Sequence, residues 1–274
     1  MAVIDYAVKY SNVVDERFKA EAKSEGFINN NYDFVGAKTV RVYNVSTAKM
    51  NDYARNGGLS RYGTPEDLDA GTQEMTMTQD RSFTFVIDKM DDEETNGALE
   101  AGKALSRQLR EVVIPEIDTY RFSKLVEGAG TTKTEALTKE NIYDAITTAT
   151  AVLDEAEVPE GGRVLVVNPT TYKLIKDSTD FVLDNEIGQE MRVKGYVAEL
   201  DGMPVLKVPA NRLGSGVNFI ITHAMACCSP VKLAEYKIHT DAPGISGELV
   251  EGRVYYDAFV LNNKKKAIYA HKNA

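Results

Sequence analysis

The feature that most constrains this chain is a long alternating strand followed by a long helical pattern, within residues 75–130. Along residues 75–88 every second side chain would lie on the same face of an extended chain. One face carries Met75, Met77, Gln79, Arg81, Phe83, Phe85 and Ile87. One strand of this length would reach roughly 45 Å, at ~3.3 Å per residue, far beyond a typical strand. We therefore expect an elongated element that needs a partner surface.

The helical pattern follows the acidic run at residues 91–94 and extends to about Val126. Apolar residues recur on one face at spacings of three and four, which is typical of an amphipathic helix. They are Ala98, Ala101, Leu105, Leu109 and Val112, and the stripe resumes with a shifted phase at Val113, Ile117 and Tyr120. The acidic run suggests either a cation site or a solvated helix start that complements the helix dipole, and we favour the second. Pro115 removes a backbone donor and predicts a kink or break.

The residues before this unit predict an arm and a hairpin. Residues 1–37 are polar and predict an extended N-terminal arm with a short helix at 13–24. Residues 38–46 alternate as a strand does, and residues 51–71 are rich in Gly, Asp, Asn and Arg. Residues 38–88 are therefore expected to form one long hairpin with an irregular tip.

The residues after the helix alternate between helical and strand patterns, so we expect an α+β fold. Thr138 is a candidate N-cap of a helix whose apolar stripe begins at Ile142, with Leu137 and Ile142 placed for a hydrophobic staple. Further elements are a strand at 163–167, a helix from Pro169 to about Lys176, a hairpin turn at Asp201 and Gly202, and a strand at 217–222. The last are a long alternating strand at 248–261 and a return strand at 267–270.

Composition excludes several classes of protein. The net charge of −9 argues against binding nucleic acid through a basic surface. No apolar run approaches the ~20 residues of a membrane span, and the N-terminus lacks a signal-peptide pattern. The only cysteines, Cys227 and Cys228, are adjacent and cannot form a disulfide framework. We expect two buried thiols and a protein that is cytosolic or assembled in the cytosol.

A search for catalytic and ligand-binding motifs finds none with the required spacing. The dinucleotide, phosphate-loop, zinc-protease and serine-hydrolase patterns are absent, and residues 130–134 match only half of a phosphate loop. His223, His239 and His271 are far apart in sequence, which favours structural roles. The basic residues 264–266 are expected to face solvent. We therefore predict no catalytic residues, no cofactor and no metal.

The order of these elements resembles the major capsid proteins of tailed bacteriophages, whose fold is named after the phage Hong Kong 97. Three stretches carry the local similarity. Residues 81–95 resemble the return strand and hinge of that family's extended loop, residues 113–120 its spine helix, and residues 255–264 its terminal strand. The resemblance covers nearly the whole chain, and the order and spacing of the three stretches support it more than any one of them.

The resemblance implies a Hong Kong 97-type α+β fold in five segments. These are an N-terminal arm (1–37), an extended loop (38–88), a spine helix of the peripheral domain (89–130), an axial domain (131–234) and long strands of the peripheral domain (235–274). Subunits would form hexamers and pentamers of an icosahedral shell around double-stranded DNA, without sequence-specific binding. The virion would be assembled in the bacterial cytoplasm.

In that fold the extended loop lies over a neighbouring subunit and the N-terminal arm links capsomers. The predicted inter-subunit contacts are Arg55, Asn56, Arg61, Tyr62, Phe83 and Phe85. Because only about 37 residues precede the loop, we expect either a separate scaffolding protein or a chain that is already the mature form; a portal and optional decoration proteins are further partners. The type member also cross-links a lysine to an asparagine; Lys49 with Asn262 or Asn263 is the nearest combination, and no motif supports it.

Three alternatives remain open at this point. An encapsulin, a bacterial cargo shell with the same fold, would need a pocket for a cargo peptide. A soluble α/β enzyme would be built around residues 163–176, but the motifs are missing and the long arms unexplained. A tail or adhesion module would normally show β-strand repeats, which the sequence lacks.

Overall fold

The computed structural model describes residues 22–29, 32, 38–56, 61–90, 100–178, 199–240 and 242–274. The chain divides into two compact units, Phe34–Thr76 and a larger unit made of Met1–Asp33 with Met77–Ala274. Most of the helix expected at residues 13–24, and the acidic run at 91–94, lie outside the described residues.

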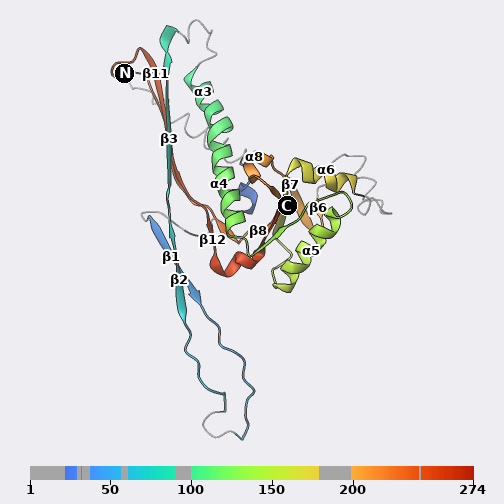
Figure 1. Cartoon of the computed structure of the whole chain (residues 1–274). Helices are drawn as coiled ribbons and strands as arrows, with labels where there is room; N and C mark the ends of the chain where they lie inside the picture. The colour runs from blue at the N-terminus through green and yellow to red at the C-terminus, as the bar shows by residue number, and fades with distance from the viewer. Residues whose placement is uncertain are drawn as a thin grey trace. The chain divides into compact units, whose positions relative to one another are not determined.

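The smaller unit is a two-stranded antiparallel ribbon of β1 (Thr39–Val45) and β2 (Ala70–Thr76), drawn in Figure 1. Its register pairs Thr39 with Thr76 and Val45 with Ala70. Arg41 and Glu74 form an exposed ion pair across the strands, with Nε 2.6 Å from Oε1. The strand at 38–46 is thus confirmed, but its partner begins at Ala70, within the stretch expected to be irregular, and ends at Thr76.

The prediction of one continuous strand over residues 75–88 is wrong. β2 ends at Thr76 and β3 (Gln79–Asp88) begins three residues later, in a different sheet. At the break, Thr78 bonds through its backbone N–H to the Asp257 carboxylate, 2.7 Å away. β3 then pairs antiparallel with β11 (Gly247–Tyr256), which pairs with β10 (Val231–His239). Within β3 the predicted alternation holds, because Ile87 is buried and its neighbours Val86 and Asp88 are exposed.

A long helix, called the spine helix below, consists of α3 (Ala101–Gln108), a π-helical turn η2 (Leu109–Val113) and α4 (Ile114–Glu127). Its described part begins at Ala101, after Glu100, whose backbone is extended with ψ 128; the start expected after residue 91 lies outside the described residues. Pro115 does not break it. In the π-turn the Ile114 N–H bonds to the carbonyl of Leu109, five residues back. The wider turn accommodates a proline ring that would otherwise crowd the carbonyl four residues before it.

The π-turn also decides which residues of the helix are buried. Val112, expected in the apolar stripe, is 44% exposed, whereas Val113 and Ile117 are buried as the shifted phase predicted. The stripe packs on one face of the β10–β11–β3 sheet in an apolar cluster. Its buried members are Ile87, Ala101, Leu105, Leu109, Val113, Ile114, Ile117, Tyr236, Val250, Val254 and Tyr256.

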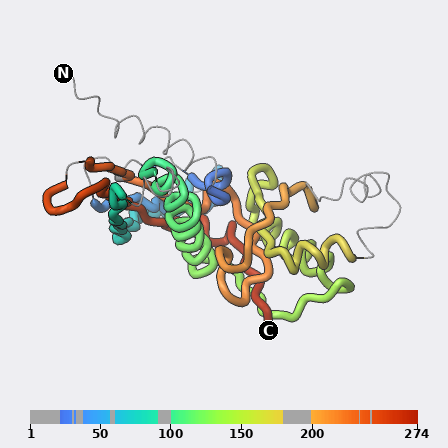
Figure 2. The backbone as a smooth tube through the Cα atoms, turned by 90° about the horizontal axis from the view of Figure 1, so that it is seen from above, coloured from blue at the N-terminus to red at the C-terminus, as the bar shows by residue number. Residues whose placement is uncertain are grey.

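A six-stranded mixed sheet forms the second layer of the larger unit, in the order β4-β13-β8-β5-β7-β6. Its strands are β4 (Thr131–Thr134), β5 (Arg163–Val167), β6 (Glu199–Leu200), β7 (Met203–Lys207), β8 (Val217–His223) and β13 (Ile268–Lys272). One face packs on α5 (Ile142–Glu155) and α6 (Pro169–Asp177), and the other on the end of α4 and on the short α8 (Ala210–Leu213). Figure 2 shows α4 and the α5–α6 pair on opposite sides of these strands.

Of the turns and helix starts predicted around this sheet, some are confirmed and one is wrong. Asn168 caps α6, since its side-chain oxygen accepts from the Thr171 N–H at 2.6 Å. Asp201 (φ 52) and Gly202 (φ 71) form the predicted hairpin turn, because both adopt the positive φ that such turns require. Thr138 is not the N-cap of α5. Asn141 precedes that helix, and its side chain accepts from the Thr138 N–H at 2.7 Å.

The predicted strand at 248–261 is also divided. β11 ends at Tyr256, and β12 (Phe259–Val260) follows and pairs with β9 (Cys227–Cys228). A 3-10 segment, η3 (Asn262–Ala267), then leads into β13. Within the described ranges, none of the helices combines the length and apolar character needed to cross a membrane.

Candidate functional site

The predicted contacts at the hairpin tip lie together in the smaller unit. Arg55, Asn56, Arg61 and Tyr62 are all exposed, Tyr62 to 83%. The Ala54 N–H donates to the Arg61 carbonyl at 3.0 Å, and the rings of Tyr53 and Tyr62 meet edge to face at 5.0 Å. The tip thus has local order of its own and presents two aromatic rings beside two arginines.

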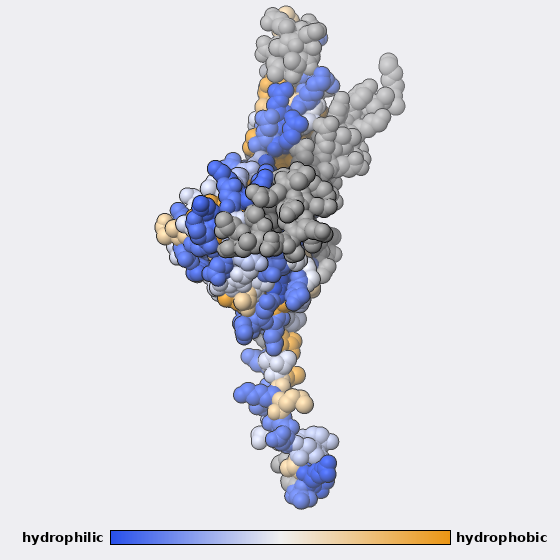
Figure 3. All heavy atoms as spheres, turned by 90° about the vertical axis from the view of Figure 1, so that its right-hand side faces the viewer, coloured by the Kyte–Doolittle hydropathy of each residue, from blue (hydrophilic) through white to orange (hydrophobic). Residues whose placement is uncertain are grey.

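The smaller unit also exposes many large apolar side chains. They are Tyr43 (72%), Val45 (56%), Met50 (98%), Tyr53 (50%), Tyr62 (83%) and Leu68 (59%). Figure 3 shows apolar residues interspersed with hydrophilic ones along this unit. A group of this size on a narrow ribbon is typical of a contact surface. Tyr43, Met50 and Leu68 were not predicted as contact residues, because their exposure becomes visible only in the folded ribbon and its tip.

Phe83 and Phe85 are placed differently from the tip residues. Both lie on the half-buried face of β3, where their rings stack at 6.2 Å, and Phe83 also stacks on Tyr236 at 6.2 Å. Gly252 of β11 lies opposite Phe83, and a Cβ there would come within 2.3 Å of the ring. These two rings therefore pack within the subunit, and their contact with a neighbouring subunit stays a prediction.

The outer face of the β10–β11–β3 sheet is polar and slightly hollowed. An open groove of ≈ 410 Å³ is lined by Ser82, Phe83, Thr84, Glu235, Lys237, Glu251, Gly252 and Arg253. Arg253 forms two hydrogen bonds to Asp80, of 2.9 and 2.6 Å, which hold the pKa of that carboxyl below its usual value. The groove carries charges of both signs on exposed side chains.

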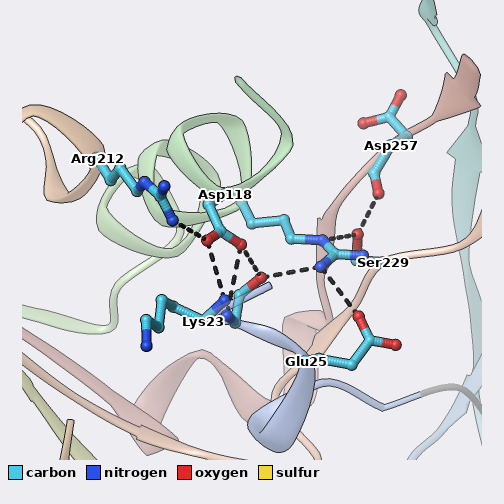
Figure 4. A network of polar contacts seen from close by, with 8 residues as sticks. Lys23, Glu25, Asp118, Arg212, Ser229 and Asp257 are labelled. Carbon is cyan, nitrogen blue, oxygen red and sulfur yellow. Dashed lines mark hydrogen bonds and ion pairs between the residues drawn. The ribbon is translucent and has the colours of Figure 1, made fainter. Parts of the chain in front are cut away.

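A buried polar cluster joins the N-terminal segment, residues 22–29, to the body of the larger unit (Figure 4). It consists of Ser24, Glu25, Asp118, Arg121, Arg212, Ser229 and Asp257. The Asp118 side chain is 0% exposed and accepts hydrogen bonds from the Ser24 hydroxyl at 2.6 Å and the Lys23 N–H at 3.0 Å. It also pairs with Arg212, whose Nη1 is 3.3 Å from Oδ2.

Arg121 extends the cluster away from Asp118. Its guanidinium is 2% exposed and donates to the Ser24 hydroxyl at 2.9 Å, to Glu25 at 3.3 Å and to the Ser229 hydroxyl at 2.8 Å. Ser229 in turn donates to the backbone carbonyl of Asp257 at 2.7 Å. A buried arginine is tolerated here because its donors have acceptors and a carboxylate lies nearby.

Asp257 fixes the point at which β3 begins. Its carboxylate accepts from the Thr78 N–H (2.7 Å), the Thr78 hydroxyl (3.0 Å), the Tyr120 hydroxyl (2.8 Å) and the Ala258 N–H (2.7 Å). Burial and the bond to Asp257 raise the pKa of Tyr120. Four donors compensate the removal of this carboxylate from water.

The cysteine pair lies beneath the N-terminal segment. The Asn29 N–H donates to the Cys227 carbonyl at 2.8 Å, and Phe27 packs in the same apolar cluster as Cys227. Both thiols are 1% exposed, as predicted, and burial raises the pKa of Cys227 to about 12 and of Cys228 to about 11. Thiols with such pKa values are unreactive at neutral pH while they stay covered.

The histidines are apart from one another, as expected. His271 is buried and stacks on Phe219 at 4.8 Å, His223 bonds to the Gly161 carbonyl at 2.9 Å, and His239 pairs with Glu251 at 3.2 Å on the exposed sheet face. In the part of the chain that the structure describes, no three His, Cys, Asp or Glu side chains are placed to hold a metal ion.

The polar cluster was not predicted from the sequence, although one signal for it was present. Asp118 and Arg121 interrupt the apolar stripe of the spine helix between Ile117, Phe122 and Leu125. Charged residues on the buried face of a helix must be paired. Their partners are about 95 residues away in sequence, so the pattern alone could not name them.

Comparison with known proteins gives matches only at the level of structure. No protein-family model matches the chain, and no curated protein is similar to it in sequence. A solved structure from Mycobacterium phage Che8 is 18% identical, with a TM-score of 0.75 over 89% of each chain. The capsid structure of Cyanophage P-SCSP1u is 14% identical, with a TM-score of 0.72 over 90% of this chain and 86% of that one.

A virus-like particle from Pyrococcus furiosus is also similar, at 10% identity. Its TM-score is 0.62, over 98% of this chain and 100% of that one. All three likenesses cover at least 89% of this chain. The chain has the Hong Kong 97-type fold of tailed-phage major capsid proteins, as the sequence predicted.

Proposed function

We propose that this chain is the major capsid protein of a tailed bacteriophage. It assembles into hexamers and pentamers of an icosahedral head shell that encloses double-stranded DNA, and its role is structural rather than catalytic. The observation that carries the proposal is the likeness of about nine-tenths of the chain to the phage structures.

The smaller unit supplies a physical reason for assembly. A two-stranded ribbon is marginal on its own in water, and this one exposes six large apolar side chains. Contact with a second copy removes this surface from water. Contacts between different surfaces of identical subunits close into rings or shells when the rotation between copies permits. Repetition of modest interfaces then stabilises the whole particle.

Within this proposal the contact residues keep their predicted roles. Arg55, Asn56, Arg61 and Tyr62 at the hairpin tip contact a neighbouring subunit, and Phe83 and Phe85 contribute through the part of their rings that is exposed. The N-terminal arm links capsomers. A separate scaffolding protein guides assembly in the host cytoplasm, and a portal and decoration proteins complete the virion. The acidic balance of the chain favours an enclosure that DNA can enter and leave.

Shortening the hairpin tests the proposal. Replacing residues 48–67 with an Asn-Gly turn keeps both strands and the hydrogen bonds that close them, between Ser46 and Asp69. We expect a folded subunit, with unchanged circular dichroism and thermal unfolding of the larger unit, that no longer forms the regular particles of the unaltered chain. Particles of normal size from the shortened chain would refute the role of the tip.

The Pyrococcus likeness favours a second candidate, an encapsulin-type shell that holds protein cargo. The contents of the particles separate the two. Particles produced together with the neighbouring genes should contain nuclease-protected double-stranded DNA if the chain is a phage capsid protein. Small particles with a co-purifying enzyme and no such DNA would establish the cargo shell instead.

A further inference from the structure

The buried polar cluster spans the larger unit from the N-terminal segment to the start of β3. Its contacts run from Ser24 to Arg121 (2.9 Å), from Arg121 to Ser229 (2.8 Å), from Ser229 to the Asp257 carbonyl (2.7 Å) and from the Asp257 carboxylate to Thr78 (2.7 Å). Figure 4 shows the first three links. Every link is a direct hydrogen bond between residues at least 28 positions apart in the sequence.

We propose that this cluster couples the docking of residues 22–29 to the order of residues 77–79, at which β3 begins. When the N-terminal segment is docked, Arg121 holds Ser229, and Ser229 holds the backbone of Asp257 in the position that presents its carboxylate to Thr78. When the segment leaves, this arrangement loosens at both ends.

Burial is the reason that the two ends respond together. Ser24 and Asp118 are 0% exposed, and Arg121, Ser229 and Asp257 are each 2% exposed, so water cannot replace a lost partner without local opening. Removing the Ser24 hydroxyl leaves Arg121 and Asp118 each short of one hydrogen bond. A buried guanidinium in that state must turn toward other acceptors, and it then pulls on Ser229.

Thr78, at the far end of the cluster from Ser24, should respond when Ser229 and Asp257 move. Thr78 is exposed and lies between β2 and β3, outside both ladders, and its two bonds to Asp257 hold it beside the buried Met77, whose carbonyl accepts from the Tyr255 hydroxyl at 3.0 Å. Tyr120 of α4 also donates to the same carboxylate, at 2.8 Å, which ties this point to the spine helix. A small shift of the Asp257 backbone therefore changes three hydrogen bonds at once, two from Thr78 and one from Tyr120.

The consequence for assembly rests on the proposed function. Residues 22–29 continue the N-terminal arm, and residue 78 follows the hairpin directly in sequence. If both appendages contact neighbouring subunits, the cluster lets the engagement of one alter the freedom of the other. Two contacts made by one subunit would then form cooperatively rather than independently.

Hydrogen exchange of the full-length, unassembled subunit tests the coupling without any need for shells. In Ser24→Ala we expect the amide of Lys23, which donates to Asp118, and the amide of Thr78, which donates to Asp257, both to exchange faster. Coupling between two sites typically changes an equilibrium constant by about 5- to 150-fold, so we expect the exchange rate of the Thr78 amide to rise at least about fivefold. The control is Ser123→Ala. The Ser123 hydroxyl bonds to Glu127 on the exposed side of α4, the helix that carries Asp118 and Arg121, so its loss should change the exchange rate of neither amide.

A substitution at the other end of the cluster provides a second, independent test. Thr78→Val removes the hydroxyl bond to Asp257 and should accelerate exchange at Lys23, because coupling between two sites is reciprocal. The double variant should show less than the product of the two single effects. Faster exchange confined to residues 22–29 in Ser24→Ala, with the Thr78 amide unchanged, would overturn the proposal. A subunit that shows the coupling but forms no shells would instead contradict only the proposed function.

Discussion

Phe27 is the apolar anchor of the N-terminal segment, and its removal should uncover the cysteine pair. The side chain is 2% exposed, and its ring lies 6.1 Å from that of Phe122. A buried Phe→Ala change costs about 3–5 kcal/mol. Because residues 25–27 form only one 3-10 turn, the loss should fall on the docking of this segment rather than on global unfolding. At about 3 kcal/mol the docking equilibrium shifts roughly 150-fold.

The rate at which a thiol reagent modifies Cys227 and Cys228 measures this shift. Both thiols are buried and their pKa values are raised to about 12 and about 11, so modification requires the covering segment to open. We expect Phe27→Ala to accelerate labelling by about 100-fold or more under native conditions, and Tyr143→Ala, at an exposed position on α5, to leave it unchanged. The same labelling rate in Phe27→Ala and the unaltered chain would refute the reasoning. So would an increase explained entirely by lower global stability in urea.

Three further predictions concern stability, each measured by urea unfolding. Gly252→Ala should destabilise the larger unit by about 1–3 kcal/mol, because the added Cβ meets the Phe83 ring at 2.3 Å; an unchanged midpoint would contradict this. Burial lowers the pKa of His271, so the charged form is disfavoured in the folded state. Stability should fall as the pH drops from about 6.5 through that lowered pKa, and less so in His271→Gln; equal pH profiles would exclude His271 as the cause. Glu74→Gln should change stability by less than about 1 kcal/mol, since the pair with Arg41 is exposed; a larger loss would show an unrecognised role.

Short-range periodicity predicted most of the fold correctly. Alternation identified β1 and the faces of β3, and spacing of three and four identified the buried stripe of α5. The turn at Asp201 and Gly202 and the start of α6 at Pro169 were also predicted, because each depends on residues only a few positions apart. The local sequence preferences of these elements are not overridden by packing against the rest of the chain.

The two long strands were predicted wrongly for one shared reason. Residues 75–88 break near Thr78, and residues 248–261 break at Asp257, and these two residues bond to each other. They are 179 positions apart in sequence. Neither break can be recognised from its own stretch of sequence, because the alternating pattern of the side chains continues through it. The structure shows one junction at which a buried carboxylate replaces ladder hydrogen bonds on both strands.

The candidate contact residues were predicted unevenly. The tip residues are exposed, as a contact surface requires, because turn-forming composition reliably indicates a loop. Phe83 and Phe85 stack within the subunit, and the glycine opposite Phe83 leaves room for its ring, which no local pattern reveals. Val112 was assigned to the buried stripe and is exposed, because a π-turn shifts the helical phase by one residue just before Pro115.

Electron microscopy of the full-length chain, expressed alone and together with its neighbouring genes, tests the central claim most directly. A capsid protein should form closed shells, tubes or six-fold capsomers in at least one of the two preparations. Light scattering on the same samples should give masses far above that of one subunit. A uniform population of monomers or dimers in both preparations would contradict the account.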